Sequence, residues 1–580
     1  MHKQKKCPIY GYNYINSENL VSNLIKTSLS FIISFFASLA FTIVVNAQGL
    51  PFSVNVPSQS GSFLAGQQAI KDLRTKKAAS FFLDAAESDW ENPQAVERAF
   101  IALVADGRVE DGAALAQHLI EMQPQNPVAR LVLGTIALKE RRYSSAITQF
   151  EKVRANNFNG ISALILNAWA LIGEKEFSAS QDLLKKLEKA GLNEFLLFHK
   201  TLMADVAGER ELALDYSKRA YEFDAFVPRI VEARVRILAN ALFFDEAQKI
   251  INDYNAQGHT SPMIDEIAKN IAAKKRPGKT VNNVQSGAAD MFHGIGTALA
   301  RDENIGLGYL FLRLGQYLDK DNVIITMALA QTLDSVELYE AANEIYANVP
   351  ANSAFKIISS IRVAENLNAL GDSERAISKL SNIATLAPDN LDAASSLGDI
   401  LRFNKKYDEA IIAYSKALKI AGGDRPADWR FYYVRGISYE RADKWPLAEK
   451  DFLKSLKLNP GHPQVLNYLG YSWVDKDMNL KQGLELIKLA VKASPMDGYI
   501  VDSLGWAYYR LGQFERAVIE LEKAVNLLPN DAEINDHLGD AYWRVGRKLE
   551  ANFQWKIAIY VDKDGIVTKR ATPKLENGLD

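Results

Sequence analysis

A fixed spacing of small residues recurs along this chain and limits what it can fold into. The glycine and two alanines of one copy are Gly505, Ala517 and Ala524, and those of the next copy are Gly539, Ala551 and Ala558. The two glycines are 34 residues apart. The preceding copies place Gly398, Gly436 and Gly470 in the same slot, and weaker copies in the N-terminal half place Gly66 and Gly134 there. A constant period of this length is typical of a protein built from stacked repeats.

The spacing predicts a pair of antiparallel helices in each repeat. Small residues at positions 8, 20 and 27 of a 34-residue unit let two helix backbones approach closely, while large residues between them fill the space. Proline at position 32, as in Pro388, Pro460 and Pro529, ends the second helix because it removes a backbone hydrogen bond and clashes in a helix interior. One pair cannot bury its apolar face alone, so neighbouring pairs are expected to stack into a continuous core.

This pattern resembles the tetratricopeptide repeat (TPR), most specifically in residues 391–565. The resemblance implies an all-α fold, a TPR α-solenoid in which antiparallel helix pairs form a superhelix, here in two segments. We expect an N-terminal segment of about six degenerate repeats in residues 59–256, a linker with a basic run in 257–288, about eight repeats in 289–565, and a tail in 566–580. The order of these parts also resembles exported bacterial multi-TPR envelope proteins.

The first 47 residues differ in composition from the rest. Lysines precede a run from Ser28 to Ala47 that carries no charge, and small residues precede Gln48. This arrangement is typical of a signal peptide cleaved after Ala47, although the apolar stretch could also stay as an N-terminal membrane anchor. In both cases we expect an exported protein in the periplasm or associated with the envelope, with membrane contact only through this segment.

Composition and motifs argue against several functions. Lys and Arg (68) nearly balance Asp and Glu (70), so no nucleic acid partner is expected. Cys7 is the only cysteine and precedes the apolar run. We find no phosphate-binding loop, zinc-protease or serine-hydrolase motif and expect neither an enzyme nor a cofactor. Asp536, His537 and Asp540 are too few for a zinc site, so no metal is expected.

The TPR resemblance places positions 2, 5, 9, 12 and 13 of each first helix in the concave groove. The predicted partner-binding residues are Tyr433, Asn467, Tyr471, Asp502, Trp506, Tyr509, Arg510, Asp536, Asp540, Trp543 and Arg544. Aromatic residues and arginine are enriched among residues that dominate protein binding. Asp536 and Asp540 would repel a terminal carboxylate, so the carboxylate clamp of some TPR domains is not expected. An internal or cationic segment fits this groove better.

We therefore expect a non-enzymatic scaffold or adaptor for protein–protein interactions, exported to the cell envelope, which binds a protein segment in the concave TPR groove. The alternative is an assembly or export factor associated with polysaccharide or peptidoglycan, because aromatic rings flanked by carboxylates also suit sugar faces. The expected partner is thus a protein or, in the alternative, a cell-wall glycan.

Overall fold

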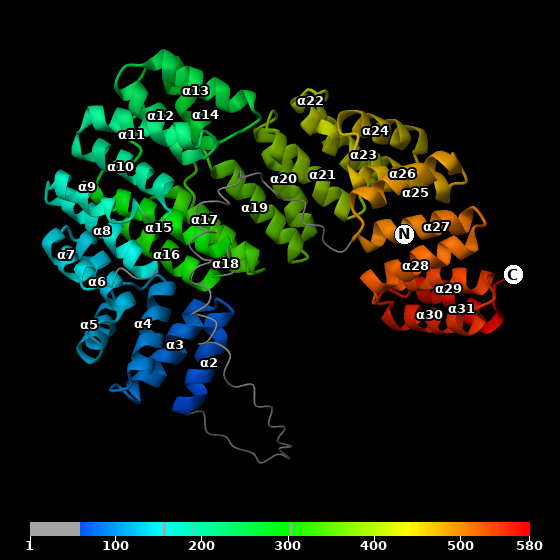
Figure 1. Cartoon of the computed structure of the whole chain (residues 1–580), viewed down its shortest axis with the longest axis horizontal. Coiled ribbons are helices and arrows are strands. Elements are labelled where there is room, and N and C mark those ends of the chain that lie inside the picture. The colour runs from blue at the N-terminus through cyan, green and yellow to red at the C-terminus, as the bar shows by residue number, and fades with distance from the viewer. Residues whose placement is uncertain (1–57, 155–157, 189–190, 302–303, 580) are drawn as a thin grey trace. The chain divides into compact units, whose positions relative to one another are not determined.

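The computed structural model describes residues 58–579 apart from 155–157, 189–190 and 302–303, and this part of the chain contains helices and no strand (Figure 1). The predicted signal segment, residues 1–47, lies outside the described residues. None of the described helices is long and apolar enough to cross a membrane. The contacts divide the chain into two units, the first ending at Val363 and the second running over Ala364–Asp580.

Each unit is a succession of paired helices. The helices of the first unit are α2 Gln59–Lys71, α3 Thr75–Glu87, α4 Pro93–Ala105, α5 Ala113–Met122, α6 Pro127–Lys139, α7 Tyr143–Glu151, α8 Phe158–Gly173, α9 Phe177–Lys185, α10 Asn193–Ala207, α11 Arg210–Phe223, α12 Pro228–Asn240, α13 Phe244–Ala256, α14 Pro262–Ala272, α15 Val284–Arg301, α16 Ile305–Leu318, α17 Val323–Ser335 and α18 Tyr339–Ala347. Helix α19, Lys356–Ala369, contains the division between the units.

The second unit continues the same pattern. Its helices are α20 Ser373–Leu386, α21 Leu391–Phe403, α22 Tyr407–Ala421, α23 Trp429–Arg441, α24 Trp445–Leu458, α25 Pro463–Asp475, α26 Leu480–Ala493, α27 Gly498–Arg510, α28 Phe514–Leu527, α29 Ala532–Arg544, α30 Lys548–Val561 and α31 Ile566–Asn577, with a short 3-10 helix at Pro426–Asp428. Consecutive helices pack against one another, as α23 does with α24 and α27 with α28.

The recurring glycine is explained by how closely the two helices of a pair approach. A Cβ atom on Gly66 would lie 2.8 Å from the ring of Phe82, and a Cβ atom on Gly539 would lie 2.5 Å from the ring of Trp555. Phe82 and Trp555 are both fully buried. The large residue of the second helix therefore occupies the space that a side chain at the glycine position would need, in both units.

The turn inside a pair requires a residue with left-handed backbone. Gly512 and Gly546 have φ of +73° and +83°, as glycine readily does. Leu242 and Asp443 adopt the same region with φ of 74° and 56°. The turn geometry is thus kept even where the residue has a Cβ atom, which makes the conformation less favourable.

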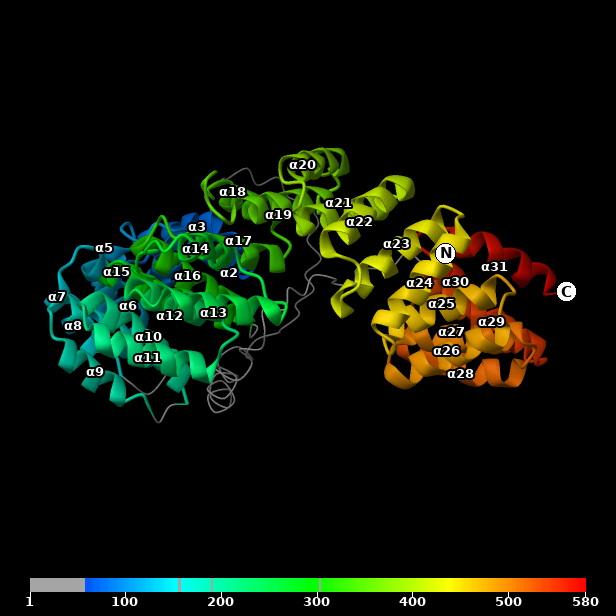
Figure 2. The ribbon, with the colours of Figure 1, turned by 90° about the horizontal axis from the view of Figure 1, so that it is seen from above.

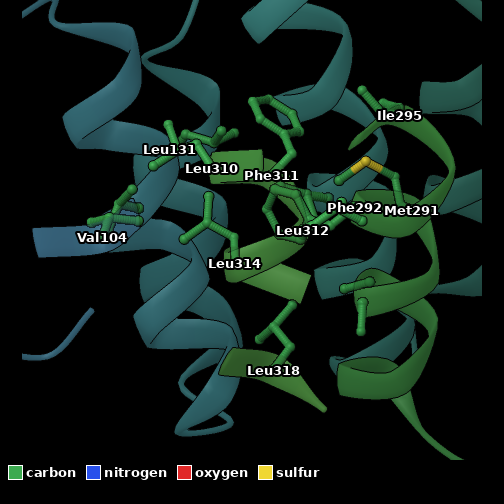
Figure 3. Packing of buried hydrophobic residues seen from close by; sticks show 14 of the residues in the cluster. Val104, Leu131, Met291, Phe292, Ile295, Leu310, Phe311, Leu312, Leu314 and Leu318 are labelled. Carbon is green, nitrogen blue, oxygen red and sulfur yellow. The ribbon is translucent and has the colours of Figure 1, made fainter. Parts of the chain in front are cut away.

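Helices α15 and α16 are packed differently from the other pairs. They contact α4, α6, α8 and α10, which are first helices of the early repeats, and both views place α16 beside α6 (Figures 1 and 2). Figure 3 shows Val104 of α4 and Leu131 of α6 with Leu310 and Leu314 of α16 in one buried cluster. The surface lined by the early first helices is therefore covered by a later part of the same chain.

Polar groups also hold α15 and α16 in place. The amide of Gln285 donates to the carbonyl of Leu138 at 2.7 Å, and the Arg313 guanidinium donates to the carbonyl of Ala105 at 3.2 Å. Close packing adds to these hydrogen bonds, because the Cβ atom of a residue replacing Gly287 would lie 2.1 Å from the Trp169 ring.

Residues 289–318, predicted above as part of the C-terminal repeats, belong to the first unit. Their small and apolar faces fit the early repeats.

The predicted linker 257–288 is partly helical. It contains α14, whose Ile264, Ile267 and Ile271 are buried in a cluster with residues of α12 and α13. The basic run Lys274–Arg276 is exposed, and the carbonyl of the following Pro277 accepts a hydrogen bond from Arg236 at 2.7 Å. The run is therefore a solvated loop within the first unit.

Candidate functional site

The predicted groove residues lie on α23, α25, α27 and α29, which are first helices of four consecutive repeats in the second unit. Their burial separates them into groups. Tyr433, Asp502, Asp536 and Asp540 are buried, Asn467, Tyr471, Trp506, Tyr509, Arg510 and Trp543 are half-buried, and Arg544 is exposed. The carboxylates that we expected to face a partner are thus largely removed from solvent, whereas most of the aromatic residues retain exposed surface.

Asp502 forms a buried ion pair with a histidine that we had not included. His537 Nδ1 lies 3.0 Å from Asp502 Oδ1, and its Nε2 lies 3.5 Å from Glu533. Burial alone would lower the pKa of His537, but the charges and hydrogen bonds of Asp502 and Glu533 outweigh it and raise this pKa to about 10. His537 is therefore protonated at neutral pH and links α27 to α29.

Three rings stack next to this ion pair. The Trp506 ring lies 4.1 Å from the His537 ring at an interplanar angle of 17°, and 4.8 Å from the Tyr509 ring at 8°. The indole N–H of Trp506 has no hydrogen-bond partner within the protein. The positions of Trp506 and Tyr509 are thus fixed by stacking on a buried, charged histidine, which pre-orders an aromatic surface.

The predicted tail forms the helix α31, and its basic residues pair with the acidic residues of α29. Lys574 Nζ lies 2.9 Å from Asp536 and 2.7 Å from Asp540, and Arg570 Nε lies 2.6 Å from Asp536. Val567 and Ala571 are buried in the apolar cluster of the last repeats. A cationic segment does contact these carboxylates, as their charge suggested, but this segment is part of the same chain.

The pKa of Asp540 reflects this crowded environment. Burial raises it, as does the neighbouring charge of Asp536, and the ammonium of Lys574 opposes both effects. The indole N–H of Trp555 donates to Asp540 at 2.9 Å. Asp536 and Asp540 therefore have partners inside the protein. The described residues contain no group of three or more His, Cys, Asp or Glu that could hold a metal ion.

Trp543 is also partly covered by the C-terminal residues. Its indole N–H donates to the carbonyl of Leu579 at 3.0 Å, and Gly578 lies so close that an added Cβ atom would be 2.2 Å from its ring. The ammonium of Lys548 lies 4.7 Å from the ring centroid. Trp543 thus contacts Gly578 and Leu579, which cover part of its ring.

Of the remaining predicted residues, Asn467, Tyr471, Tyr509, Arg510 and Arg544 keep exposed surface, whereas Tyr433 is buried. Arg510 pairs with Asp477 at 2.7 Å, and Arg544 Nε lies 3.3 Å from the Tyr509 hydroxyl. Burial and then the charges of Asp475 and Asp502 raise the pKa of Tyr471, which stays neutral. The structure therefore brings together Tyr471, Trp506, Tyr509 and Arg544 as neighbours of a charged network, while Tyr433 packs against Phe452 and Tyr468 at ring distances of 6.2 and 6.0 Å.

The sequence contained signals for the groups that we missed. Arg570 and Lys574 are one turn apart, as are Asp536 and Asp540, so two helices with these pairs can neutralise each other. His537 enters the sequence prediction only with Asp536 and Asp540, as a group too small for a zinc site. Its role depends on Asp502, 35 residues earlier, which only the stacking of two repeats brings within reach.

Comparisons with known proteins agree with this repeat structure. The family model described as "Tetratricopeptide repeat" matches residues 98–159 and 364–426, and that described as "TPR repeat" matches 505–546. A "TPR repeat-containing protein" of Pseudomonas aeruginosa is 28% identical over 181 residues, which is 31% of this chain and 30% of that protein. The human "Tetratricopeptide repeat protein 13" is 28% identical over 198 residues, or 33% of this chain and 22% of that protein. The matches thus span less than a third of either relative.

Solved structures with a similar succession of helices include the APC/C hetero-tetramer Cut9–Hcn1, with a TM-score of 0.38, 14% identity, and coverage of 90% of this chain and 97% of that one. Yeast Tom70 matches with a TM-score of 0.35, 13% identity, and coverage of 90% and 95%. Because these TM-scores are low, the assignment rests on the matched repeats and on the helix pairs described above. With TPR models matching in both units, this chain is a multi-repeat TPR protein with an all-α solenoid fold.

Proposed function

We propose that this protein is an exported, non-enzymatic scaffold that binds a segment of a protein partner in the groove of its second unit. The observation that carries the proposal is the stacked surface of Tyr509 and Trp506 on His537, beside the exposed Arg544. Aromatic residues and arginine contribute most to protein interfaces, and rings fixed before binding lose little conformational freedom when a partner arrives.

The charges near this surface narrow the chemistry of the partner. Asp502, Asp536 and Asp540 are already paired with His537, Arg570 and Lys574, so they offer less attraction to a cationic segment than the sequence suggested. Tyr509 and Arg544 are the groups with exposed or half-exposed surface next to one another. A segment with an apolar or aromatic side chain complements the stacked rings of Trp506 and Tyr509 best.

Export is part of the proposal and has its own test. The basic, apolar and small-residue parts of residues 1–47 support secretion. N-terminal sequencing of the protein from fractionated cells is expected to begin at Gln48, in the periplasmic or envelope fraction. Recovery of the chain only from the cytoplasm would contradict export.

Site-specific photocrosslinking tests the groove. With benzoylphenylalanine in place of Tyr509, we expect a discrete crosslinked partner that disappears when Trp506 is changed to Ala. The control carries the same crosslinker in place of Ile519, which is 54% exposed on α28 outside the predicted groove, and is expected to give no such product. Equal crosslinking from both positions, with both proteins folded by circular dichroism, would rule the groove out.

The polysaccharide alternative predicts a different result. A factor that recognises glycan through Trp506 and Tyr509 would sediment with purified peptidoglycan in the absence of any other protein, and the Trp506→Ala variant would not. We expect no such sedimentation, because the buried carboxylates nearby are already paired within the protein and cannot serve sugar hydroxyls without breaking these pairs.

A further inference from the structure

The outer face of α30 carries a row of exposed apolar side chains. Leu549, Phe553, Ile557 and Tyr560 are 68%, 57%, 39% and 90% exposed. They are three or four residues apart along the helix, so they lie on one face. Ile566, at the start of α31, is also half exposed. We call the four residues of α30 the α30 stripe; both helices are labelled in Figure 1.

The corresponding face of α28 is different, although the two helices occupy the same place in consecutive repeats. The residues of α28 34 positions before Leu549, Phe553, Ile557 and Tyr560 are Glu515, Ile519, Lys523 and Asn526. Ile519 is the exposed apolar residue among these four. Single exposed apolar residues are ordinary on a protein surface, but a contiguous row indicates a contact with another molecule.

Exposed positive charge surrounds the α30 stripe. Lys556 on α30, Lys563 between α30 and α31, and Lys569 on α31 are exposed. Lys548 is exposed as well, but its ammonium lies over the Trp543 ring. Of the nearby carboxylates, Glu550 pairs with Arg547 at 3.1 Å and Asp562 accepts from the Thr568 backbone N–H at 2.7 Å, while Asp564 is exposed. The rim of the stripe is therefore cationic and fits an anionic surface.

We propose that the α30 stripe is a membrane-surface contact, by which the second unit lies on anionic lipid. Apolar side chains would enter the boundary between headgroups and acyl chains while the lysines remain among the headgroups, as in helices that lie on membranes. Tyr560, the most exposed residue of the stripe, has an apolar ring and a polar hydroxyl, which suits an interface.

The geometry favours lipid over a second copy of the chain or another protein. Two copies paired through this face would bring their lysines together, and like charges would oppose the contact. Residues that dominate protein interfaces are usually set in well-packed pockets, whereas these side chains project from the outer side of a helix. A deformable anionic surface accommodates such a projecting row.

Vesicle sedimentation tests the proposal with the chain that begins at Gln48. This form contains every described residue and lacks the apolar stretch of residues 29–45, which would bind lipid itself. We expect it to sediment with vesicles of equal phosphatidylcholine and phosphatidylglycerol, and at least about five-fold less with phosphatidylcholine alone, because the lysines contribute through charge. Binding to the mixed vesicles should also weaken as salt is raised.

A pair of variants locates the contact. Phe553→Ser with Tyr560→Ser is expected to reduce binding to the mixed vesicles by about five-fold or more, since apolar burial drives insertion. Ile519→Ser, at the position of α28 equivalent to Phe553, is expected to bind as the unchanged chain does. Circular dichroism and thermal melting establish that both variants are folded.

Three results would overturn the proposal. The folded, unchanged chain could fail to sediment with the mixed vesicles. Both variants could bind equally well. Alternatively, analytical ultracentrifugation could show self-association that the double variant abolishes, without vesicle binding, which would assign the stripe to a second copy of the chain.

Discussion

Equivalent positions of the repeat have opposite character in the two units. The fifth residue of α6 is Leu131 and that of α29 is Asp536; the twelfth residue of α4 is Val104 and that of α27 is Tyr509. In the first unit these residues are covered by α15 and α16. In the second they form a polar and aromatic surface, and α31 packs against α29 and α30 of its last repeat.

The repeat pattern alone therefore does not determine whether the surface lined by the first helices is covered by the chain itself or open to a partner. The positions that define the helix pair, such as Gly66 and Gly539, are alike in both units. The residues at positions 5 and 12 of the first helices determine what covers this surface. Where they are apolar, burial by another part of the chain is favoured; where they are aromatic and charged, the surface can remain in water until a partner binds.

The largest expected effect on stability comes from breaking the buried ion pair between Asp502 and His537 in the second unit. Asp502→Ala would leave the protonated His537 buried next to Glu533 alone, and breaking a buried ion pair by removing one partner costs about 3 to 5 kcal/mol. The free energy of unfolding from urea titration measures this. Asp475→Ala is the control, because that side chain is 53% exposed; a similar loss in both variants would contradict the role of the buried pair.

The packing of α15 in the first unit is tested by adding a side chain at Gly287, where α15 lies closest to Trp169. Gly287→Leu would force α15 away from Trp169, at a cost of about 3 kcal/mol for overpacking, and should lower the melting temperature of the first unit. Gly306→Leu is the matched control on α16, since an added Cβ atom meets nothing there within 4 Å. Equal melting temperatures for the two variants would show that α15 is not tightly held.

The attachment of α31 should be weaker, because it depends more on charge. Lys574→Ala leaves Asp540 without its ammonium partner and is expected to cost about 2 kcal/mol. Lys569→Ala, at an exposed position of the same helix, should change stability by less than about 0.5 kcal/mol. If Lys574→Ala were as mild as Lys569→Ala, the pairing with Asp536 and Asp540 would contribute nothing to holding α31.

The stability of the second unit should also depend on pH. Because the pKa of His537 is raised to about 10, its contribution is fully present below the unfolded pKa of about 6.5 and is lost as pH rises toward 10. The slope is at most about 1.4 kcal/mol per pH unit. The contribution of His537 is isolated by comparing the free energy of unfolding of the unchanged chain and of His537→Gln between these pH values. An equal pH dependence of the two proteins would contradict it.

The smallest effect should be the same in both units. Leu242→Gly in the first unit and Asp443→Gly in the second relieve left-handed backbone and should each stabilise by about 0.5 kcal/mol, since the gain is partly offset by the greater freedom of glycine when unfolded. Thermal melting measures both. A gain in only one unit would mean that these turns are not equivalent.

The sequence predicted the fold well because the repeat is local. The distance from Gly505 to Ala517 specifies one helix pair, and its recurrence specifies the stack. What could not be predicted was which segments far apart in the chain would meet. Gln285 bonds to the carbonyl of Leu138, 147 residues away, and no local pattern specifies such a contact.

The candidate site was predicted less completely for the same reason. Trp506 and Tyr509 follow from their positions in the repeat, and both keep some exposed surface. Asp536 and Asp540 have the predicted charge but pair with Arg570 and Lys574 of a segment that looked like a tail. Apolar residues at groove positions, such as Leu131, were the available signal that the first groove is filled.

Thiol labelling compares the two grooves most directly. The chain from Gln48 contains no cysteine, so Leu131→Cys in the first unit and Tyr509→Cys in the second each provide one reporter. If the first groove is filled and the second is open, Tyr509→Cys reacts with a maleimide in the folded protein, whereas Leu131→Cys reacts only when urea unfolds the first unit. Equal labelling rates in the native state would contradict this difference between the units.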